Sequence, residues 1–577
     1  MERGDHKPLL DQVSDSPSWS YQDNNVLLEE GDTLHCRSRI KPFSWKAPAI
    51  VLGFEFLESI AFAGISLNLV VYLADVLHGT TASNAANVDT WSGTTFLAPV
   101  LGAFLADTYL GKYKTIAISI VLYLLGMLTI TLSAMIPSLR PVSCKGISCP
   151  AATEFQYTVF FIALYLIAIG TGGVKSALMP FGADQYDETN PDEAQKKQSF
   201  FSLFFVAVNL GVFIAGTVVV WIQQNIAWGL GFGISLACLV VATVGFFVGT
   251  PTYRVQMPTG SPLKSVVRVL IVAFKKRHLE LPDDSALLYE GEMGSGREWQ
   301  HKLDHTDGFR FLDKAAVMAV PYSTDLSPAT PWLSCTVTQV EEVKILLRMV
   351  PIWLTCIFYS ASMCQTMTTF LQQGVLMNST IGSLSIPAAS LSSIEVIFMM
   401  IFVVIQDQII IPICRKRFQN PSGLTQLQRM GIGRFLVIFS MAAAAGIETW
   451  RLSAYKDNKR LSILWQVPQF LILAWSDVFC GIALLEFFYG EAPESMRSLC
   501  SAFSFLAISL GYYLNSFVVT FVAGITKSVD GMGWLPADLN MGHLDYYFWL
   551  WAGISAINFV VFVALSWNYT HKKVVLK

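Results

Sequence analysis

The sequence predicts an all-α polytopic membrane protein with twelve transmembrane helices in two six-helix bundles. Of its 577 residues, 53% are hydrophobic and only 14% are charged, whereas soluble proteins carry about 25% charged residues. The mean hydropathy is +0.49. Apolar runs long enough to cross about 30 Å of hydrocarbon occur twelve times. The net charge of −3 argues against a nucleic-acid partner.

The expected spans follow one another along nearly the whole chain. They lie at 47–77, 91–107, 115–136, 156–176, 199–222, 228–249, 345–371, 388–413, 431–450, 464–488, 499–524 and 545–567. The charge-rich stretch after the sixth span predicts a soluble linker with one or two amphipathic helices. The predicted domains are an N-terminal tail (1–46), a first bundle (47–249), the linker (250–343), a second bundle (344–567) and a C-terminal tail (568–577).

The distribution of lysine and arginine places both tails and the linker in the cytoplasm. In that orientation the inner segments carry 28 basic residues and the outer loops carry 7, although the short loops alone favour it only by 9 to 7. The exception is RLSAYKDNKR (451–460), which has four basic residues on the predicted outer side.

The predicted outer loops contain two sites of covalent modification. Cys144 and Cys149 lie in one loop and are candidates for a small disulfide. Asn378 begins an Asn-Ser-Thr sequence in another outer loop and is a candidate glycan acceptor. Asn568 begins a similar sequence, which we expect to stay bare in the cytoplasm.

Ionisable residues inside apolar spans are costly and commonly functional. In EFLESIAFAG, Glu55, Glu58 and Ser59 have the i, i+3, i+4 spacing that places them on one helix face. Lys175 follows the run GTGG, which we interpret as flexible. We expect Lys175 to be the counter-charge of Glu58 and the set to exchange protons.

Two further carboxylates lie in the second half, at Glu395 in the eighth span and Asp477 in the tenth. The alternative for each of these buried charges is a packed pair between helices, or a position nearer the membrane surface than expected.

The turn between the second and third spans carries a second pattern. GAFLADTYLGKYK contains Gly102, Asp107, Gly111 and Lys112, an arrangement typical of major-facilitator carriers. The aspartate can pair with a neighbouring helix end and the lysines with cytoplasmic acids, which would form a latch that opens in one state. The alternative is an ordinary turn that follows the positive-inside rule.

Longer motifs extend this resemblance. The anchors are WSGTTFLAPVLGAFLADTYLGKY (91–113), GTGGVKSALMPFGADQYDE (170–188), CTVTQVEEVKILLRMVPIW (335–353), LTQLQRMGIG (424–433), LEFFYGEAPESMRSLCSA (485–502) and GHLDYYFWL (542–550). From about Trp45 to Tyr569 the chain resembles the proton-dependent oligopeptide transporters, in particular the peptide-carrying branch of the plant nitrate/peptide transporter family. The resemblance implies a major-facilitator fold, a central cavity and proton-driven solute uptake without a cofactor.

The resemblance also assigns roles to residues. The family's first helix carries ExxER, whose acids couple protons and whose arginine helps to hold a peptide carboxylate. Glu55 and Glu58 match the acids, but Ser59 replaces the arginine, which is not a conservative change in a carboxylate clamp. The fourth-helix lysine is kept as Lys175, and the tenth-helix glutamate corresponds to Asp477.

The polar groups that would grip a peptide are fewer than in the family pattern. Two first-helix tyrosines correspond to Phe62 and Ala63, and a fifth-helix amide and tyrosine correspond to Ser202 and Phe205. The expected substrate pocket is Ser59, Phe62, Ala63, Lys175, Ser202, Phe205, Met363 and Asp477.

Three functions are compatible with this sequence. The first is a proton-coupled carrier of a small solute, with di- or tripeptides and nitrate as the family's usual classes and other organic acids or metabolites still open. The second is a weakly transporting or sensor-like protein. The third, an enzyme, finds no support, because the histidines lie in tails, loops or span ends and HKLDH (301–305) lies in the charged linker, so we expect no metal site.

The N-terminal tail contains two possible sorting signals. DHKPLL (5–10) and DNNVLL (23–28) both have an acidic residue ahead of a leucine pair, a pattern that sorting adaptors can bind. The expected location is the vacuolar or the plasma membrane. The expected partners are therefore a small solute, protons, the lipid bilayer and such adaptors.

Overall fold

The computed structural model describes residues 45–141, 152–186, 191–255, 262–279, 305–317, 335–381, 384–418, 424–491, 497–527 and 533–569, with the single positions 281, 288, 289 and 303. Cys144, Cys149 and both leucine pairs of the N-terminal tail lie outside these described residues. The disulfide and the sorting signals therefore stay predictions.

The first group of helices precedes the linker. It consists of α1 (Lys46–Ser66), α2 (Leu69–Asp75), α3 (Thr81–Leu105), η1 (Ala106–Leu110), α4 (Lys112–Met135), η2 (Pro137–Leu139), α5 (Glu154–Ala183), α6 (Pro191–Ile214), η3 (Ala215–Val219), α7 (Val220–Asn225), α8 (Trp228–Val248) and η4 (Thr250–Thr252). The described linker elements are α9 (Pro262–Lys275) and the 3-10 helix η7 (Arg310–Ala316).

The second group of helices follows the linker. It consists of α10 (Val337–Met363), η8 (Cys364–Met367), α11 (Thr369–Val375), η9 (Ala388–Ser390), α12 (Leu391–Ile405), η10 (Gln406–Ile410), α13 (Ile411–Phe418), α14 (Gln426–Lys456), η11 (Ile463–Gln466), α15 (Val467–Glu491), α16 (Arg497–Ile525), η13 (Leu539–Met541) and α17 (Leu544–Trp567). Between α11 and η9, β1 (Thr380–Ile381) pairs antiparallel with β2 (Leu384–Ser385).

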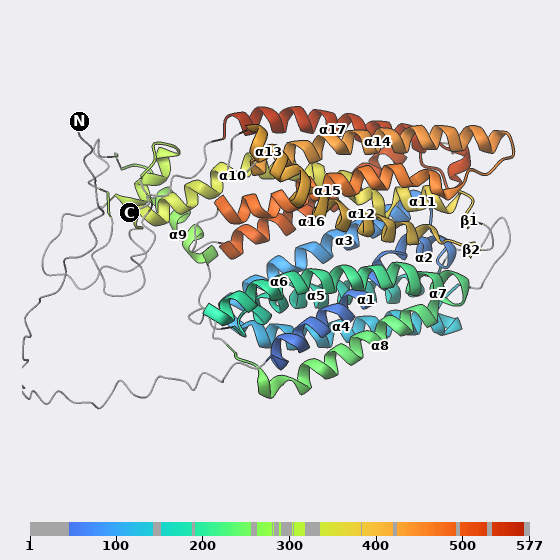
Figure 1. Ribbon diagram of the computed structural model, residues 1–577, viewed down its shortest axis with the longest axis horizontal. Helices are drawn as coiled ribbons and strands as arrows, with labels where there is room; N and C mark the ends of the chain where they lie inside the picture. Colours follow the sequence, from blue (N-terminus) through green and yellow to red (C-terminus); the bar gives the residue numbers. More distant parts are fainter. Residues whose placement is uncertain are drawn as a thin grey trace, which may run out of the picture. The chain divides into compact units, whose positions relative to one another are not determined.

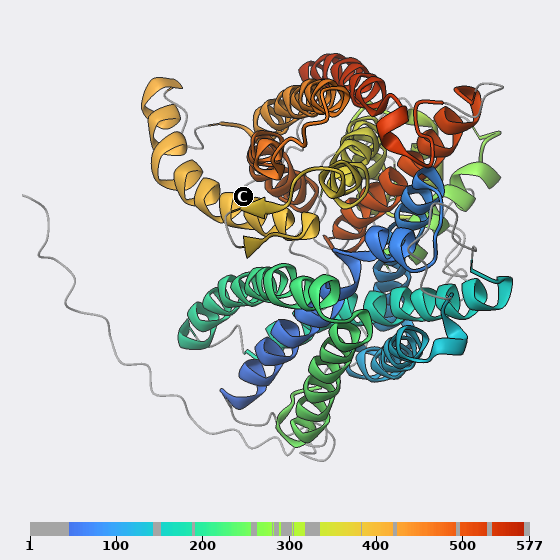
Figure 2. The ribbon, with the colours of Figure 1, turned by 90° about the vertical axis from the view of Figure 1, so that its right-hand side faces the viewer.

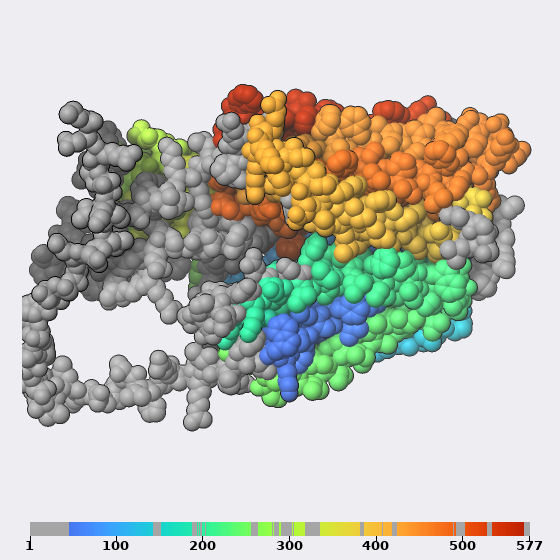
Figure 3. All heavy atoms as spheres, in the orientation of Figure 1, coloured from blue at the N-terminus to red at the C-terminus, as the bar shows by residue number. Residues whose placement is uncertain are grey.

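Each group packs mainly within itself. In the first, α4 packs on α5, α3 on α5, and α1 on α6 and α8; in the second, α14 packs on α15 and α17, α10 on α16, and α12 on α15. Figure 2 shows the blue-to-green helices on one side and the yellow-to-red helices on the other. The principal contact between the groups joins α3 to α16, and in the space-filling view the yellow α12 region lies against the green helices (Figure 3).

Eleven helical segments within the described residues are long and apolar enough to cross a membrane. The expected second span corresponds to α3, which begins at Thr81 rather than at residue 91. The side chain of Thr80 accepts a hydrogen bond from the Ser83 amide and so caps the helix. The following residues, ASNAANVDT, are too polar to be recognised as a membrane span, although they continue the helix.

The fourth span differs from the prediction in length and in character. Helix α5 runs to Ala183, well past Lys175, and GTGG is an internal part of it. The interpretation of GTGG as a flexible run was therefore wrong. A Cβ at Gly170 would lie 2.5 Å from the Tyr123 backbone nitrogen, and a Cβ at Gly172 would lie 2.2 Å from the Ala98 Cβ. The glycines let α5 approach α4 and α3 closely, as small residues do in membrane helix pairs.

Helix α14 explains the loop that did not fit the charge distribution. The helix continues to Lys456, so Arg451 is helical rather than part of a loop. Arg451 donates from Nη2 to Glu448 Oε1 at 2.7 Å, and both side chains are buried. One of the four basic residues on the predicted outer side is thereby neutralised inside the protein.

The linker carries the expected amphipathic helix, α9, and η7 is attached to the second group. Lys344 at the start of α10 is fully buried and contacts Asp313 Oδ1 at 2.7 Å and Glu341 Oε1 at 2.8 Å. After α9, Lys276 donates to the Val317 carbonyl, and burial lowers the pKa of its ammonium group. These contacts fix η7 against the end of the bundle at which α9 lies (Figure 1).

Candidate functional site

Glu58 is buried in α1 and, among the described residues, forms no ion pair with a cation. Its side chain is 0% exposed. Oε1 accepts hydrogen bonds from the Tyr123 hydroxyl of α4 at 3.2 Å and from Thr171 Oγ1 of α5 at 2.9 Å. Oε2 is buried and has no hydrogen-bond partner among the described residues. Ionisable groups buried inside a membrane span are commonly functional, which makes Glu58 a candidate site residue.

Lys175 lies close to this site but does not pair with Glu58. Its Nζ lies over the Phe62 ring, 3.7 Å from the ring centroid, and Phe62 in turn stacks on Trp91. Such a cation–π contact stabilises an ammonium group that has left water. The predicted contact between Glu58 and Lys175 is wrong for this conformation, because Glu58 is held by hydroxyl groups instead.

Glu55 of α1 interacts electrostatically with both Glu58 and Lys175. Its side chain is 5% exposed, and the charges of both Glu58 and Lys175 act on its carboxylate. The charges of the two glutamates and the lysine thus interact at Glu55, whereas their role in proton coupling stays a prediction. The structure also adds two partners, Tyr123 and Thr171, which sequence reasoning missed because a hydroxyl in an apolar span gives no signal of its own.

The remaining first-group pocket candidates differ in their surroundings. Ser59 is 5% exposed, and a Cβ at Gly211 of α6 would lie 2.6 Å from its Cβ. Ala63 is 3% exposed and packs in the core, whereas Phe205 on α6 is 52% exposed. The side chain of Ser202 is outside the described part of the chain. Ser59 therefore occupies a tight contact between α1 and α6.

The second group contributes two buried acids, Glu395 and Asp477. The charge of Asp477 on α15 acts on Glu395 of α12. A Cβ at Gly481, one turn after Asp477, would lie 2.5 Å from Asp477 Oδ1, so the carboxylate folds over this glycine. Met363 is half-buried at the end of α10. Among the described residues, neither acid forms an ion pair comparable to that of Glu448 with Arg451, so both remain candidates for binding a cationic group.

The motif between α3 and α4 forms one contact of the predicted latch. Lys112 Nζ lies 2.5 Å from Asp184 Oδ2 at the end of α5. Gly111 has φ 76° and ψ 156°, a conformation that an L side chain rarely adopts. Gly102 packs on the backbone of α5, where a Cβ would lie 3.0 Å from Gly173 Cα. Asp107 lies in the π-helical turn η1 and is half-buried.

One cluster has the composition of a metal site. His305, Asp313 and Glu341 each offer a ligand atom, and these atoms lie within 4.8 Å of one another. The Lys344 ammonium contacts both carboxylates. A cation of the protein therefore already neutralises this cluster, and it is better explained as an ion-pair network that anchors η7.

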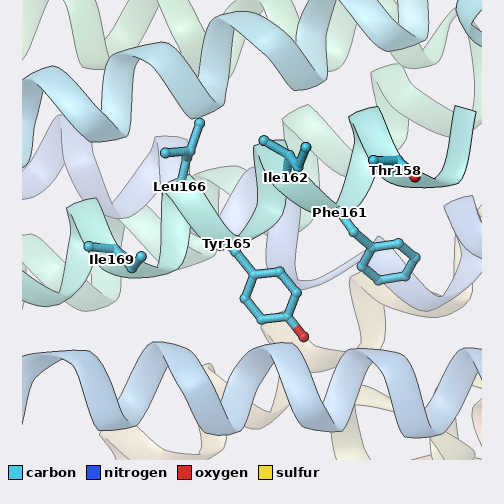
Figure 4. A pocket seen from close by; sticks show the side chains of 6 residues that line it. All are labelled: Thr158, Phe161, Ile162, Tyr165, Leu166 and Ile169. Atoms are coloured by element: carbon cyan, nitrogen blue, oxygen red, sulfur yellow. The ribbon is translucent and has the colours of Figure 1, made fainter. Parts of the chain in front are cut away.

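A groove of about 350 Å³ runs along one face of α5 (Figure 4). It is lined by Thr158, Phe161, Ile162, Tyr165, Leu166 and Ile169. The lining has no charged group, and Ile162 and Ile169 are more than half exposed. Because such an apolar face suits lipid, the groove is not a candidate site for a polar solute.

The glycan candidate Asn378 has a defined backbone environment. Its amide donates to the Leu461 carbonyl at 2.8 Å, and its Oδ1 accepts from the Thr380 hydroxyl at 2.6 Å. Asn378 lies between α11 and β1, at the end of the bundle away from α9 (Figure 1). Glycosylation of this residue stays a prediction.

Two buried charged groups were missed by sequence reasoning. Arg434 on α14 is 1% exposed and donates to Cys480 Sγ, Cys356 Sγ and Thr355 Oγ1. Asp89 on α3 is 0% exposed. Asp89 was overlooked because the expected span began at residue 91, but an aspartate after the apolar Val88 was a usable signal.

Comparison with known proteins agrees with this architecture. The POT family model matches residues 113–535. Two relatives from Arabidopsis thaliana are Protein NRT1/ PTR FAMILY 8.5, 45% identical over 93% of this chain and 92% of that protein, and Protein NRT1/ PTR FAMILY 8.3, 44% identical over 92% and 93%.

Solved structures show the same fold at low sequence identity. An auto inhibited POT family peptide transporter has a TM-score of 0.67 at 19% identity, covering 91% of this chain and 97% of that one. The POT family transporter PepTSo has a TM-score of 0.67 at 20% identity, covering 91% and 99%. These neighbours are transporters with the twelve-helix major-facilitator fold, not enzymes. The chain is therefore an integral, multi-pass membrane transporter and belongs to the POT family.

Proposed function

We propose that the protein is a proton-coupled secondary active transporter that moves a small solute by alternating access. The observation that carries the proposal is the environment of Glu58. A fully buried glutamate accepts two hydroxyl hydrogen bonds and has one oxygen without a partner among the described residues, and its charge acts on Glu55 together with that of Lys175. Such a group can hold a proton while the site is closed and release it when water enters.

Glu55 and Lys175 have a complementary role in this proposal. The Glu55 charge offsets that of the lysine, while the Phe62 ring covers the ammonium group. When Glu55 or Glu58 takes up a proton, the positive charge of Lys175 is less compensated. Lys175 then becomes available to bind an anionic group of the solute, which couples proton binding to solute binding.

The solute class is limited by which charged groups are present. Lys175 supplies a point charge that suits a carboxylate or nitrate, and Glu395 and Asp477 on the second group suit an amino group. Short peptides carry both charges, so we propose peptides or nitrate as the first classes to test. The relatives' name, NRT1/ PTR, and POT structures with alafosfalin or 5-aminolevulinic acid support small polar solutes.

Reconstituted protein tests the proposal directly. Proteoliposomes with an imposed pH gradient would be screened for uptake of nitrate, dipeptides, a hormone-like acid and a secondary metabolite. Lys175→Ala should nearly abolish gradient-driven uptake, whereas Ser176→Ala should retain it, because the Ser176 hydroxyl only donates to the Gly173 carbonyl. Uptake by Lys175→Ala at the wild-type rate would refute the role of the lysine.

A second pair of variants tests the amino-group site. Asp477→Asn should weaken uptake of substrates with an amino group and spare nitrate. Gly481→Ala should also weaken uptake of substrates with an amino group, because the new methyl group would displace the Asp477 carboxylate. Gly446→Ala is the matched control, since a Cβ there has open space around it. Equal loss of nitrate and dipeptide uptake would contradict this assignment.

A sensor-like or weakly transporting protein is the second candidate, and Ser59 is the observation that favours it. The family arginine is absent, and Ser59 is buried against α6 near Gly211. Ser59→Arg would restore the peptide clamp if the side chain fits this contact. Increased dipeptide uptake by a folded Ser59→Arg variant would show that the missing arginine limits transport, and no uptake of any solute by the wild type would favour a sensor.

We further propose that the N-terminal leucine pairs direct the transporter to the vacuolar membrane through sorting adaptors. The proposal is supported by the acidic residue ahead of each pair. Replacing Leu9, Leu10, Leu27 and Leu28 with alanine should move a fluorescent fusion to the plasma membrane. An unchanged location would refute it.

A further inference from the structure

Among the described residues, the hydrogen bonds that join the two groups of helices gather on one segment of α3. The hydrogen bonds observed between described residues of the two groups involve residues 81–94 of α3. We call this contact between α3 and α16 the seam. It lies away from α9, near α2, α11 and the β-hairpin (Figure 1), which is the predicted outer end.

Most hydrogen bonds of the seam join neutral groups. Thr90 Oγ1 lies 2.9 Å from Ser516 Oγ, Thr94 Oγ1 lies 2.8 Å from the Tyr513 hydroxyl, and Ser509 Oγ donates to the Gly93 carbonyl at 2.7 Å. Such contacts cost little to exchange for water, because each hydrogen bond contributes only about 0.5–1.5 kcal/mol net. The neutral hydrogen bonds of the seam can therefore be broken and formed again at a small cost in free energy.

Asp89 is the exception within the seam. Its side chain is 0% exposed, Oδ2 accepts a hydrogen bond from Asn515 Nδ2 at 2.7 Å, and Oδ1 is buried without a partner among the described residues. The orientation of the Asn515 amide is fixed, because its Oδ1 accepts from Gln365 Nε2 at 2.8 Å and from the Tyr547 hydroxyl at 3.0 Å. The carboxyl group thus lies in a polar network without an opposite charge.

The groups that face Asp89 cannot supply a counter-charge. Asn515 is an uncharged amide. The titratable groups on which the Asp89 charge acts are Cys364 of η8, Tyr512 of α16 and Tyr547 of α17. On the side of α5, Trp91 next to Asp89 donates to the Leu164 carbonyl. Within the described residues, no lysine, arginine or histidine pairs with Asp89. A charged carboxylate here would cost several kcal/mol, whereas the protonated acid is neutral.

We propose that Asp89 is a second proton-binding site, separate from the Glu55–Glu58–Lys175 cluster, and that the seam closes only when its carboxyl group carries a proton. When α3 and α16 separate, water reaches Asp89, the proton leaves to water and the carboxylate opposes reclosure. This inference rests on the proposed function for its role in the cycle, because it sets the pH on the outer side at which the outer gate can close.

Cross-linking can test the seam without measuring transport. Thr90→Cys with Ser516→Cys places two thiols where the hydroxyls lie 2.9 Å apart. The rate of disulfide formation under a mild oxidant, measured by mass spectrometry of the linked peptide, reports the closed seam. The rate is compared between this double variant and the same protein with Asp89→Asn, so that the intrinsic pH dependence of the thiols cancels in the ratio.

The ratio of the two rates, Asn over Asp, should rise as the pH is raised from 5 to 8. The limit is about tenfold per pH unit, which is the slope for loss of one proton. Thr94→Val in place of Asp89→Asn is the control, because it removes a seam hydrogen bond but no titratable group, and its ratio should be independent of pH. A constant ratio for Asp89→Asn would overturn the proposal.

If the Asp89→Asn variant does not fold, Asp89→Ser, which is also uncharged at this position, takes its place in the comparison. Because cross-linking needs no solute, a rising ratio would support the Asp89 site even if proton-driven uptake were never found. Conversely, a constant ratio in a protein with normal gradient-driven uptake would refute Asp89 and leave the proposed function intact.

Discussion

Glu58 in the first group and Glu448 in the second have the same chemistry and the same burial, but different partners. Both side chains are 0% exposed. Glu448 accepts from Arg451 Nη2 at 2.7 Å, from Arg451 Nε at 2.9 Å and from Gln373 Nε2 at 2.9 Å. Glu58 accepts only from two hydroxyl groups and has one oxygen without a described partner.

The difference shows what distinguishes a structural buried charge from one that can exchange protons. The Arg451 guanidinium holds both oxygens of Glu448, so protonating that acid would leave a buried cation without a partner. Protonating Glu58 breaks no direct ion pair, because its hydrogen-bond donors Tyr123 and Thr171 are neutral. Burial alone therefore does not suggest a coupling site, and the absence of a direct ion pair is what makes Glu58 the proposed one.

The largest expected effect comes from breaking the structural pair. Arg451→Leu leaves the Glu448 carboxylate buried with only Gln373, and should lower the free energy of unfolding by about 3–5 kcal/mol. Thermal unfolding in detergent measures this. Arg429→Leu is the control, because the partner of Arg429, Glu486, is 44% exposed. Loss of this pair should lower the free energy of unfolding by at most about 1 kcal/mol. Similar losses of unfolding free energy for both variants would contradict the distinction between the buried pair and the partly exposed pair.

Glu58→Gln should affect transport rather than stability. The amide oxygen can still accept from Tyr123 and Thr171, so the melting temperature should change little. Gradient-driven uptake should fall about tenfold or more, which corresponds to about 1.4 kcal/mol, while downhill exchange persists. Glu58→Asp keeps the acid and should restore part of the pH dependence. Full gradient-driven uptake by the glutamine variant would show that Glu58 is not the coupling group.

Tyr123→Phe tests a single partner of Glu58. Loss of the hydroxyl removes one hydrogen bond to the carboxylate, worth about 0.5–1.5 kcal/mol. The charged form is weakened more than the neutral form, so the pH of half-maximal uptake should rise by about one unit at most. Tyr157→Phe on α5 is the control, because its hydroxyl bonds only to the Leu77 carbonyl. A shift to lower pH would contradict the assigned hydrogen bond.

The smallest expected effect concerns the ring that covers Lys175. Phe62→Leu keeps the apolar volume but removes the cation–π contact, which contributes about 0.5–2 kcal/mol. The solute concentration at half-maximal uptake should change by less than about tenfold, without loss of the maximal rate. Phe205→Leu, at an exposed position, should leave both unchanged. If Phe62→Leu were as inactive as Lys175→Ala, the ring would have a larger role than covering the lysine.

The fold and part of the site could be predicted from local patterns. Apolar length revealed the membrane helices, and the i, i+3, i+4 spacing placed Glu55, Glu58 and Ser59 on one face. Local pattern failed where a helix was polar or small-residue-rich: α3 was shortened at its start, and GTGG in α5 was interpreted as flexible. In both cases the neighbouring helices, rather than the segment's own hydropathy, stabilise the helical conformation.

The sequence by itself determined that this is a multi-pass membrane protein with acids and a lysine inside the membrane, because hydropathy and charge are properties of each segment. Its motifs, through their resemblance to a known family, implied a transporter. Only the tertiary structure decided which groups answer those charges. The partners of Glu58 lie 65 and 113 residues away, and Asn515 lies 426 residues from Asp89. Contacts over such separations depend on how the helices pack, and packing places a hydroxyl, a ring or an amide where spacing alone suggested a lysine.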